Sequence, residues 1–349
     1  MFHITNRRYT GAKTKLLQNI DSALSKNFDY ESKKNLRFFD VFGGTGVVSA
    51  YFMQKAQFSS FIINDFLYSN YAIYQGFFAK QDFDVKKIKA FKEMYQNLKD
   101  QNLQENYYSR HFGGKFFSVN DSKIVGKIRE DLDKNLKAGA INQKEFYILL
   151  ASLLYSVDKI ANTVGHYDAY RKNVSLCDKF HFECIKPLQN KAKIEIFRQD
   201  SNQLVKDLIH HKKCIDIAFI DPPYNSRQYS RFYHLLETLS KNDKPKLYGI
   251  ALKPKPENMS SYCKTEATKV LKDLIENLAK ISKILVLTYN NTYHSKSSSS
   301  QNKIQLNQIQ KILKAVGKTS SYEFDFKAFS SGKTELRGHK EMIFVGKIQ

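Results

Sequence analysis

The run Ile215-Asp216-Ile217-Ala218-Phe219-Ile220, followed at once by Asp221-Pro222-Pro223-Tyr224, decides the fold of this 349-residue chain. A short apolar run that closes at Asp-Pro-Pro is typical of a buried strand that stops at a carboxylate, because proline cannot continue a strand ladder. In an open α/β sheet, ligands bind at the carboxyl ends of the strands. The pattern therefore predicts a binding site at residues 221–224.

The residue types at this strand end suit one kind of ligand atom. Asp221 offers a carboxylate acceptor, and Pro222 offers a carbonyl whose direction is restricted by the proline that follows. Tyr224 offers a flat ring for stacking. Two acceptors beside a ring match a planar exocyclic amine such as adenine N6, which has two N–H donors and a π-face. Stacking needs the ring alone, so Tyr224→Phe is expected to keep substantial activity.

The first third of the chain predicts the opening of a doubly wound sheet. The strand-like run 36–42 leads into Gly43-Gly44-Thr45-Gly46, and residues 47–57 then have a helical pattern. A second strand-like run, 58–63, ends shortly before Asp65. Strand, glycine turn and helix form the context that a nucleotide-type ligand requires, because glycine lets the backbone approach closely. The acid that follows the second strand is placed to reach a ribose hydroxyl.

The glycine turn excludes one class of ligand. The fingerprint G-x-G-x-x-G of dinucleotide-binding folds is absent, and Gly43 and Gly46 frame a shorter turn that follows Asp40. This argues against a pyrophosphate cradle. The turn suits a ligand without phosphates, such as S-adenosyl-L-methionine.

The ordered motifs resemble those of a known family. Residues 39–46 (Phe-Asp-Val-Phe-Gly-Gly-Thr-Gly) together with residues 221–224 are similar to the DNA N6-adenine methyltransferases, and the motif order resembles their alpha-type, Dam-like group. Upstream, Tyr9-Thr10-Gly11-Ala12-Lys13 resembles the N-terminal aromatic-x-Gly-x-Lys motif of the same family. Residues 225–229 and 234–237 look most like the restriction-modification branch, which includes the FokI-type methylases.

The resemblance implies a role for each matching residue. It implies that Asp221, Pro222 and Tyr224 are catalytic and hold a flipped-out adenine. It implies that Asp65 holds the ribose hydroxyls and that Asp200 lies near the cofactor adenine, although either acid could instead be a helix cap. The full set of implied cofactor contacts is Tyr9, Lys13, Asp40, Phe42, Gly43, Gly46, Asp65, Asp200 and Asp221.

The composition of the chain limits which binding partners and which cellular location are expected. The formal net charge of +22 favours a polyanionic partner, with nucleic acid ahead of a membrane surface, although biased codon usage also yields lysine-rich chains. The four cysteines form no C-x-x-C pair and no zinc spacing, so neither a disulfide scaffold nor a metal site is expected. Residues 1–17 have no apolar signal segment. We therefore expect a cytoplasmic chain that associates with the nucleoid when it is bound to DNA.

The segment between Asp65 and Asp200 is longer than a β-α-β alternation requires. Helical patterns at 85–99 and 144–157 and basic aromatic clusters at 107–112 and 165–173 predict a mostly helical target recognition domain. Most of its aromatic residues are expected in its core. The residues expected to contact DNA are Tyr170, Arg171, Lys172, Arg227 and Arg337.

The sequence thus predicts an α/β fold with a Rossmann-like, S-adenosylmethionine-dependent methyltransferase sheet. Residues 1–66 and 197–349 are expected to form the catalytic domain, and residues 67–196 the inserted recognition domain. The expected activity is methylation of adenine N6 at specific sites in double-stranded DNA by a monomer, with a cognate restriction endonuclease that acts separately. An RNA base methyltransferase and a catalytically silent nucleic-acid-binding protein remain alternatives.

Overall fold

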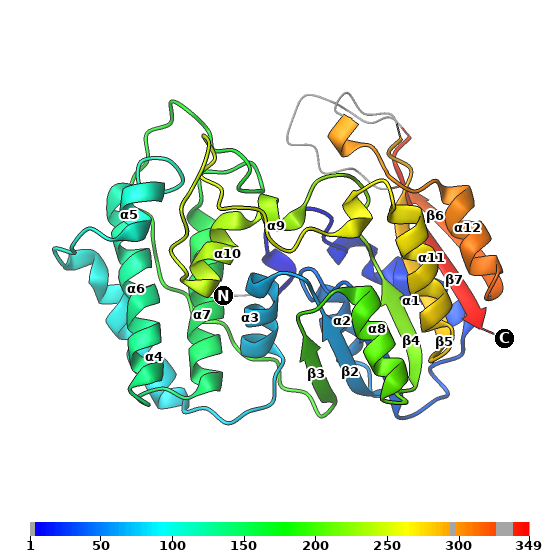
Figure 1. Ribbon diagram of the computed structural model, residues 1–349. Helices are drawn as coiled ribbons and strands as arrows, with labels where there is room; N and C mark the ends of the chain where they lie inside the picture. The colour runs from blue at the N-terminus through cyan, green and yellow to red at the C-terminus, as the bar shows by residue number, and fades with distance from the viewer. Residues whose placement is uncertain (1–3, 294–297, 326–337, 349) are drawn as a thin grey trace. The chain divides into compact units, whose positions relative to one another are not determined.

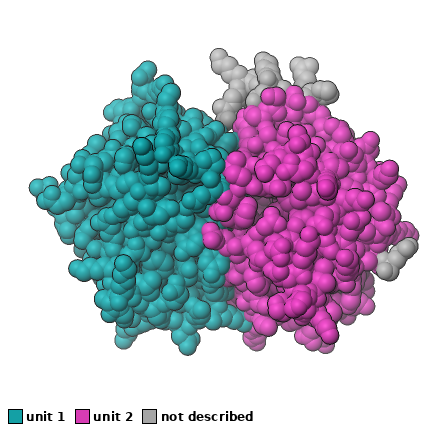
Figure 2. Space-filling model, in the orientation of Figure 1, with its two compact units in different colours: residues 1–10, 67–189, 229–257 teal, residues 11–66, 190–228, 258–349 magenta. Residues whose placement is uncertain are grey.

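The computed structural model describes residues 4–293, 298–325 and 338–348. The chain divides into two compact units (Figure 2). Unit 1 consists of residues 1–10, 67–189 and 229–257, and unit 2 of residues 11–66, 190–228 and 258–349. No helix among the described residues is long and apolar enough to cross a bilayer. Those residues also contain no group of three histidine, cysteine or acidic side chains placed to hold a metal ion.

Unit 2 is built on a seven-stranded sheet with the order β3-β2-β1-β4-β5-β7-β6 (Figure 1). The first five strands in the chain run parallel, whereas β7 is antiparallel to both β5 and β6. Strands β1 to β3 move outward in one direction and β4 and β5 in the other, so the strand order reverses between β1 and β4. The strands are β1 (Leu36–Asp40), β2 (Phe58–Asn64), β3 (Lys193–Phe197), β4 (Ile215–Ile220), β5 (Ser282–Asn290), β6 (Gly317–Asp325) and β7 (Lys340–Ile348).

Neighbouring side chains of β1 enter different parts of the core of unit 2. Phe39 joins a buried cluster that includes Leu204 of α8 and Leu271 of α11. Phe38 instead stacks on Phe52 of α2, with 4.9 Å between the ring centroids. This alternation follows from the two-residue period of a strand, which turns successive side chains to opposite faces. The helices of unit 2 are α1 (Leu17–Asn27), α2 (Val47–Phe52), α8 (Ser201–His210), α11 (Ala267–Leu278) and α12 (Leu306–Lys314).

Unit 1 is mostly helical. Its longest helices, α6 and α7, have buried faces, and α7 packs closely against α3. Gly76 of α3 makes this approach possible, since an added Cβ would lie 2.5 Å from the carbonyl oxygen of Tyr147. The helices are α3 (Tyr68–Phe77), α4 (Val85–Gln96), α5 (Tyr107–Phe112), α6 (Val119–Lys137), α7 (Gln143–Ile160), α9 (Tyr229–Phe232) and α10 (His234–Lys241).

The predicted fold class is confirmed: the structure has a doubly wound sheet and a mostly helical insertion. Every predicted strand of the parallel sheet is present, but the helix expected over 47–57 ends at Phe52 and turns at Met53. The compact units differ from the predicted domain bounds, because residues 1–10 and 229–257 pack with the insertion and residues 190–196 pack with the sheet. Contacts between segments distant in sequence decide such boundaries, and local patterns do not report them.

Candidate active site

The carboxylate of Asp221, directly after β4, is held by three side chains of unit 2. Its Oδ1 accepts hydrogen bonds from the Tyr224 hydroxyl and from Thr288 Oγ1, each at 2.8 Å. Its Oδ2 lies 2.9 Å from the Nζ of Lys13. Thr288 belongs to β5, the strand beside β4, so the sheet itself brings this hydroxyl to the end of β4. The carboxylate is thereby fixed in one orientation.

A second carboxylate, that of Glu341, joins the same network. Glu341 is buried on β7, where its Oε1 lies 2.6 Å from the Tyr224 hydroxyl oxygen and 3.4 Å from Lys13 Nζ. The single hydrogen of that hydroxyl is therefore shared between Glu341 and Asp221. No sequence signal marked Glu341 as a site residue. It is the second residue of an ordinary terminal strand, and only the pairing of β7 with β5 brings it to this edge.

Lys13 is the buried cation of this network. Burial alone would lower its pKa, but the charges of Asp221 and Glu341 outweigh that effect, and the pKa of Lys13 is raised. The ammonium therefore stays charged at neutral pH, and it also donates a 3.0 Å hydrogen bond to the Gly11 carbonyl. The sequence motif had placed Lys13 at the cofactor, whereas in the structure it contacts the proposed catalytic acid directly.

The two remaining parts of the Asp-Pro-Pro-Tyr strand end differ in what they contact. Among the described residues, no donor reaches the carbonyl of buried Pro222. The Tyr224 ring lies 4.4 Å from the Tyr289 ring and 5.0 Å from Lys13 Nζ, measured from its centroid. Its hydroxyl hydrogen bonds show that Tyr224 does more than present a flat face.

Asp40, the last residue of β1, is a buried acid beside these groups. Ser49 donates a 2.6 Å hydrogen bond to Oδ2, whereas the buried Oδ1 has no hydrogen-bond partner. Burial raises the pKa of Asp40 to about 7, and the charges of Asp221 and Asp65 act in the same direction against the Ser49 hydrogen bond. An orphaned carboxylate oxygen in an acidic surrounding is suited to receive a positively charged group.

The glycine turn after β1 is fixed by the acid that follows β2. The Gly44 amide donates a 2.8 Å hydrogen bond to Asp65 Oδ2, and the Gly43 amide donates one of 2.7 Å to the carbonyl of Asn64. Gly44 and Gly46 have φ values of 52° and 80°, in the left-handed region that favours glycine. Asp65 therefore holds the glycine turn, and the N-cap residue of the following helix α3 is Leu67. The predicted ribose contact of Asp65 stays a prediction.

Two further predicted cofactor contacts lie near this turn in sequence or along the sheet edge. Asp200 caps α8 by accepting hydrogen bonds from the amides of Asn202 and Gln203, as its alternative role predicted. Phe42 packs edge-on against Tyr262 at 5.1 Å. The structure therefore gives both residues packing or capping roles, and their cofactor roles remain predictions.

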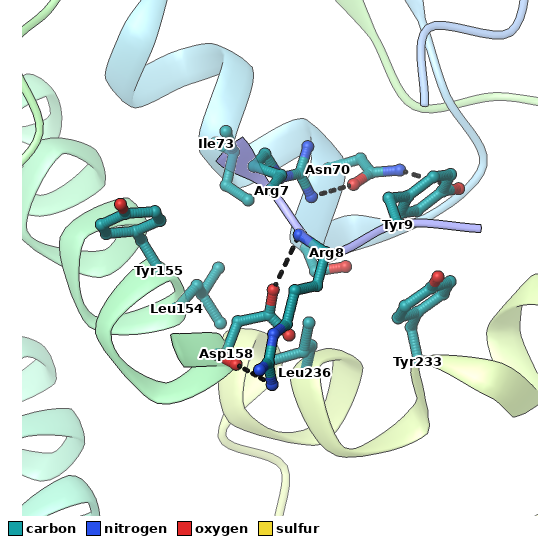
Figure 3. A pocket seen from close by; sticks show the side chains of 11 residues that line it. Arg7, Arg8, Tyr9, Asn70, Ile73, Leu154, Tyr155, Asp158, Tyr233 and Leu236 are labelled. Carbon is teal, nitrogen blue, oxygen red and sulfur yellow. Dashed lines mark hydrogen bonds between the residues drawn. The ribbon is translucent and has the colours of Figure 1, made fainter. Parts of the chain in front are cut away.

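Tyr9 belongs to unit 1, where it lines a pocket with residues from α3, α7 and α10 (Figure 3). Its ring stacks on Tyr233 at 4.7 Å with an interplanar angle of 7°, and Asn70 donates a 3.4 Å hydrogen bond to its hydroxyl. In the same pocket, Arg7 donates a 2.7 Å hydrogen bond to Asn70. The predicted cofactor contact of Tyr9 is not tested by these interactions.

The residues predicted to contact DNA are spread over both units. Arg171 and Lys172 are exposed on a loop of unit 1, whereas the Tyr170 ring packs edge-on against Phe116 at 5.2 Å. Arg227 belongs to unit 2 and is half-buried, with its Nε 3.4 Å from Ser299 Oγ. Arg337 lies outside the described residues.

Comparison with known proteins gives matches that span the same motifs. Residues 9–292 match the family model of the D12 class N6 adenine-specific DNA methyltransferases. The chain is 31% identical to the type II methyltransferase M.FokI of Planomicrobium okeanokoites, over 90% of this chain and 48% of that protein. It is 28% identical to the type II methyltransferase M.NlaIII of Neisseria lactamica, over 95% of each chain.

A third relative, the modification methylase StsI of Streptococcus sanguinis, is 32% identical over 81% of this chain and 44% of its own length. The chain thus spans about half the length of M.FokI and StsI, but nearly all of M.NlaIII. The family match extends from the Tyr9 motif past the Asp221 strand end, which confirms the family that the sequence motifs predicted. The chain belongs to the D12 class of N6 adenine-specific DNA methyltransferases.

Proposed function

We propose that this chain transfers a methyl group from S-adenosyl-L-methionine to N6 of an adenine flipped out of duplex DNA, at one specific site. The observation that carries the proposal is the pair of acceptors at the end of β4. Asp221 Oδ2 accepts from Lys13 alone among the described residues, which leaves a further lone pair, and the Pro222 carbonyl accepts from no described donor. An exocyclic amine has one N–H for each acceptor.

The acceptors act by preparing the nucleophile. The lone pair of adenine N6 is delocalised into the ring, so the free amine is a poor nucleophile. Hydrogen bonds from its two N–H groups to Asp221 and Pro222 draw the nitrogen toward tetrahedral geometry and localise the lone pair. Tyr224 and Thr288 hold the carboxylate so that it need not reorganise during the reaction. The catalytic gain is then positioning and electrostatics.

The residues after β1 fit the proposed cofactor. S-adenosylmethionine supplies a sulfonium-bound methyl group together with a second positive charge on its amine. Asp40 offers a buried, orphaned carboxylate oxygen, and Asp65 and Asp221 add acidic charge around it. The three glycines at 43, 44 and 46 let the backbone approach the ligand without a Cβ in the way. The same acidic groups would repel a phosphate-bearing cofactor.

The role of the insertion follows from the proposed reaction. A flipped adenine is common to every site, so discrimination between sequences must come from side chains outside the strand end. We assign it to the helical segment 67–196 and, within it, to the loop that carries Arg171 and Lys172. Arg227 and Arg337 are proposed to contact phosphates.

The partners are proposed on the relatives' printed names. M.FokI and M.NlaIII are type II methyltransferases and StsI is a modification methylase, which supports duplex DNA over RNA as the substrate and a separate restriction endonuclease as a companion. We propose that the chain acts as a monomer. The catalytically silent alternative is disfavoured because Lys13, Asp221 and Tyr224 form a complete network.

The test is to map N6-methyladenine in plasmid DNA from cells that express the chain, followed by assay of the purified protein with labelled S-adenosylmethionine. Asp221→Asn should abolish transfer. It replaces one acceptor oxygen with an NH₂ donor and removes the negative charge, while it keeps the shape of the side chain. Asp82→Asn makes the same change at an exposed position and should leave transfer unchanged. Near-normal turnover by folded Asp221→Asn would refute the acceptor role, and absence of methyladenine with the unaltered chain would refute the activity.

A further inference from the structure

Residues 244–255 form a basic hairpin in unit 1, called here the Tyr248 hairpin. The backbone amides of Tyr248 and Lys253 each donate to the carbonyl of the other, at 2.8 and 2.9 Å. Gly249 and Leu252 turn the chain with φ values of 68° and 56°. The two hydrogen bonds between Tyr248 and Lys253 close a four-residue tip, Gly249 to Leu252, and so restrain its backbone.

The tip presents apolar side chains to solvent. Ile250 is 72% exposed, more than any other large hydrophobic residue that the structure describes, and Tyr248 beside it is 44% exposed. A single exposed apolar side chain is ordinary, but two at the tip of a tight hairpin form a projecting apolar point. Exposed apolar side chains in this position are suited to insertion into a binding partner, and they do not cover the core of unit 1.

The base of the hairpin is anchored to the rest of unit 1. The Tyr107 hydroxyl donates a 2.5 Å hydrogen bond to the Pro245 carbonyl, and Arg231 donates one of 2.5 Å to the carbonyl of Pro254. Lys253 forms an ion pair with Asp168. Pro245 and Pro254 lie at its two ends, Pro256 follows directly after it, and these three of the chain's six prolines restrict the backbone further. These contacts and prolines therefore restrain the base of the hairpin that carries the apolar point.

Charge identifies the class of partner. The twelve residues 244–255 contain four lysines and no acidic residue. Lys246 and Lys255 are exposed, and neither forms an ion pair within the described parts of the chain. Lys246 Nζ lies 5.7 Å from the centroid of the Tyr248 ring, so positive charge stands beside the apolar point. A partner must combine a dense negative surface with narrow apolar gaps, and the base steps between the phosphates of duplex DNA have both.

We propose that the Tyr248 hairpin is a DNA wedge, in which Ile250 and Tyr248 enter a base step while Lys246 and Lys255 contact the flanking phosphates. The proposal rests on the proposed function, since it needs duplex DNA as substrate. Unstacking a step costs energy, which the buried apolar tip and the phosphate contacts offset. A step already opened in this way lowers the cost of extruding the target adenine.

The test uses Ile250→Ser, which removes the exposed apolar tip without disturbing a core. The matched control is Val119→Ser on α6, where the side chain is 54% exposed and no lysine lies within three positions along the chain. Transfer is measured on a duplex that carries the mapped site and on the same duplex with the target adenine mismatched. Ile250→Ser should lower transfer to the paired duplex about tenfold or more, whereas the mismatch should restore most of it, because an unpaired base is cheaper to extrude.

A second variant tests the phosphate contacts. Lys246→Ala with Lys255→Ala should weaken binding to all duplexes alike and reduce the slope of log affinity against log salt by about 2. Binding of S-adenosylmethionine, measured by calorimetry, should not change in any of these variants.

The failures are distinguishable from one another. Absence of transfer by the unaltered protein would refute the proposed function. Transfer by the unaltered protein together with equal rates for Ile250→Ser would refute the wedge alone. Binding to vesicles of phosphatidylserine that depends on Ile250, or a change of oligomeric state in Ile250→Ser with DNA methylation intact, would also overturn it in favour of a membrane or a second copy of the chain.

Discussion

The ammonium of Lys13 lies 2.9 Å from the carboxylate of Asp221, although 207 residues lie between them along the chain. Both side chains are largely buried, and Glu341 supplies a second negative charge to the same lysine. The strand end that is proposed to hold the substrate amine therefore already holds a protein amine, and the two must share the carboxylate. Oδ2 can accept from both, one through each lone pair.

Lys13→Met is expected to destabilise the fold as well as the site. Removing one partner of a buried ion pair leaves two acidic groups uncompensated, which costs roughly 3–5 kcal/mol. Urea unfolding should show this loss in the free energy of unfolding. The control Lys15→Met changes an exposed lysine two positions away and should fall within about 0.5 kcal/mol of the unaltered chain. Equal midpoints for the two variants would mean that the Lys13 ion pair contributes nothing.

Tyr224→Phe is expected to lower the rate of methyl transfer about tenfold or more, even though the ring is kept. The hydroxyl contacts both Asp221 and Glu341, and hydrogen bonds to charged groups contribute about 1.5–3 kcal/mol. This differs from the expectation based on stacking alone. Single-turnover rates with saturating cofactor measure the effect, and Tyr322→Phe on β6 serves as the control. An unchanged rate would restore the ring-only role.

Tyr224 and Glu341 are expected to act together. Glu341→Gln keeps the shape of the side chain but removes the charge that faces Lys13 and the Tyr224 hydroxyl. In a double-mutant cycle with Tyr224→Phe, the effects on unfolding free energy should depart from additivity by about 0.5–3 kcal/mol. Additive effects would show that the 2.6 Å contact carries no coupling.

Asp40 predicts a pH dependence of stability with a definite sign. Its pKa is about 7 in the folded chain and 3.8 ordinarily, so between these values the folded state holds a proton that the unfolded state has lost. Stability from this group therefore falls as the pH rises from about 4 to about 7, by at most about 1.4 kcal/mol per pH unit. Asp40→Asn removes the decline.

Urea unfolding of both proteins across this range checks the sign for Asp40. The difference in unfolding free energy, Asp40→Asn minus the unaltered chain, should grow in favour of the variant up to about pH 7 and then level off. A constant difference would mean that Asp40 titrates alike in both states. Because a bound cation favours the ionised form, S-adenosylmethionine should bind the unaltered chain more tightly as the pH rises through the same range.

The paired substitution Arg171→Ala and Lys172→Ala is expected to weaken DNA binding while it leaves cofactor binding unchanged. If both side chains contact phosphates, the salt slope falls by about 2, and if Arg171 reads a base edge, site preference relaxes by about 1–3 kcal/mol. Filter binding on cognate and scrambled duplexes over a salt series separates the two roles. Lys33→Ala with Lys34→Ala removes two exposed charges elsewhere as the control. Unchanged affinity and preference would place recognition in other segments, such as 107–112 or 241–264.

The sequence by itself determined the sheet and the location of its binding edge. The run 215–220 is apolar except at Asp216 and is buried at every position of β4, because a central parallel strand has no solvated face. The glycines after β1 and the prolines after β4 mark strand ends through local backbone restrictions that need no tertiary contact. These signals lie within a few residues of the feature that they predict, which is why they can be recognised in the sequence.

Only the tertiary structure decided which side chains meet at that edge. Glu341 reaches Lys13 and Tyr224 because β7 inserts between β5 and β6, a strand order that no local pattern encodes. The same holds for residues 1–10 and 229–257, which pack with the insertion despite their place beside the catalytic motifs in the sequence. Hydrogen bonds and charge pairs act over a few ångströms, whatever the separation along the chain, so their partners become visible only once the chain has folded.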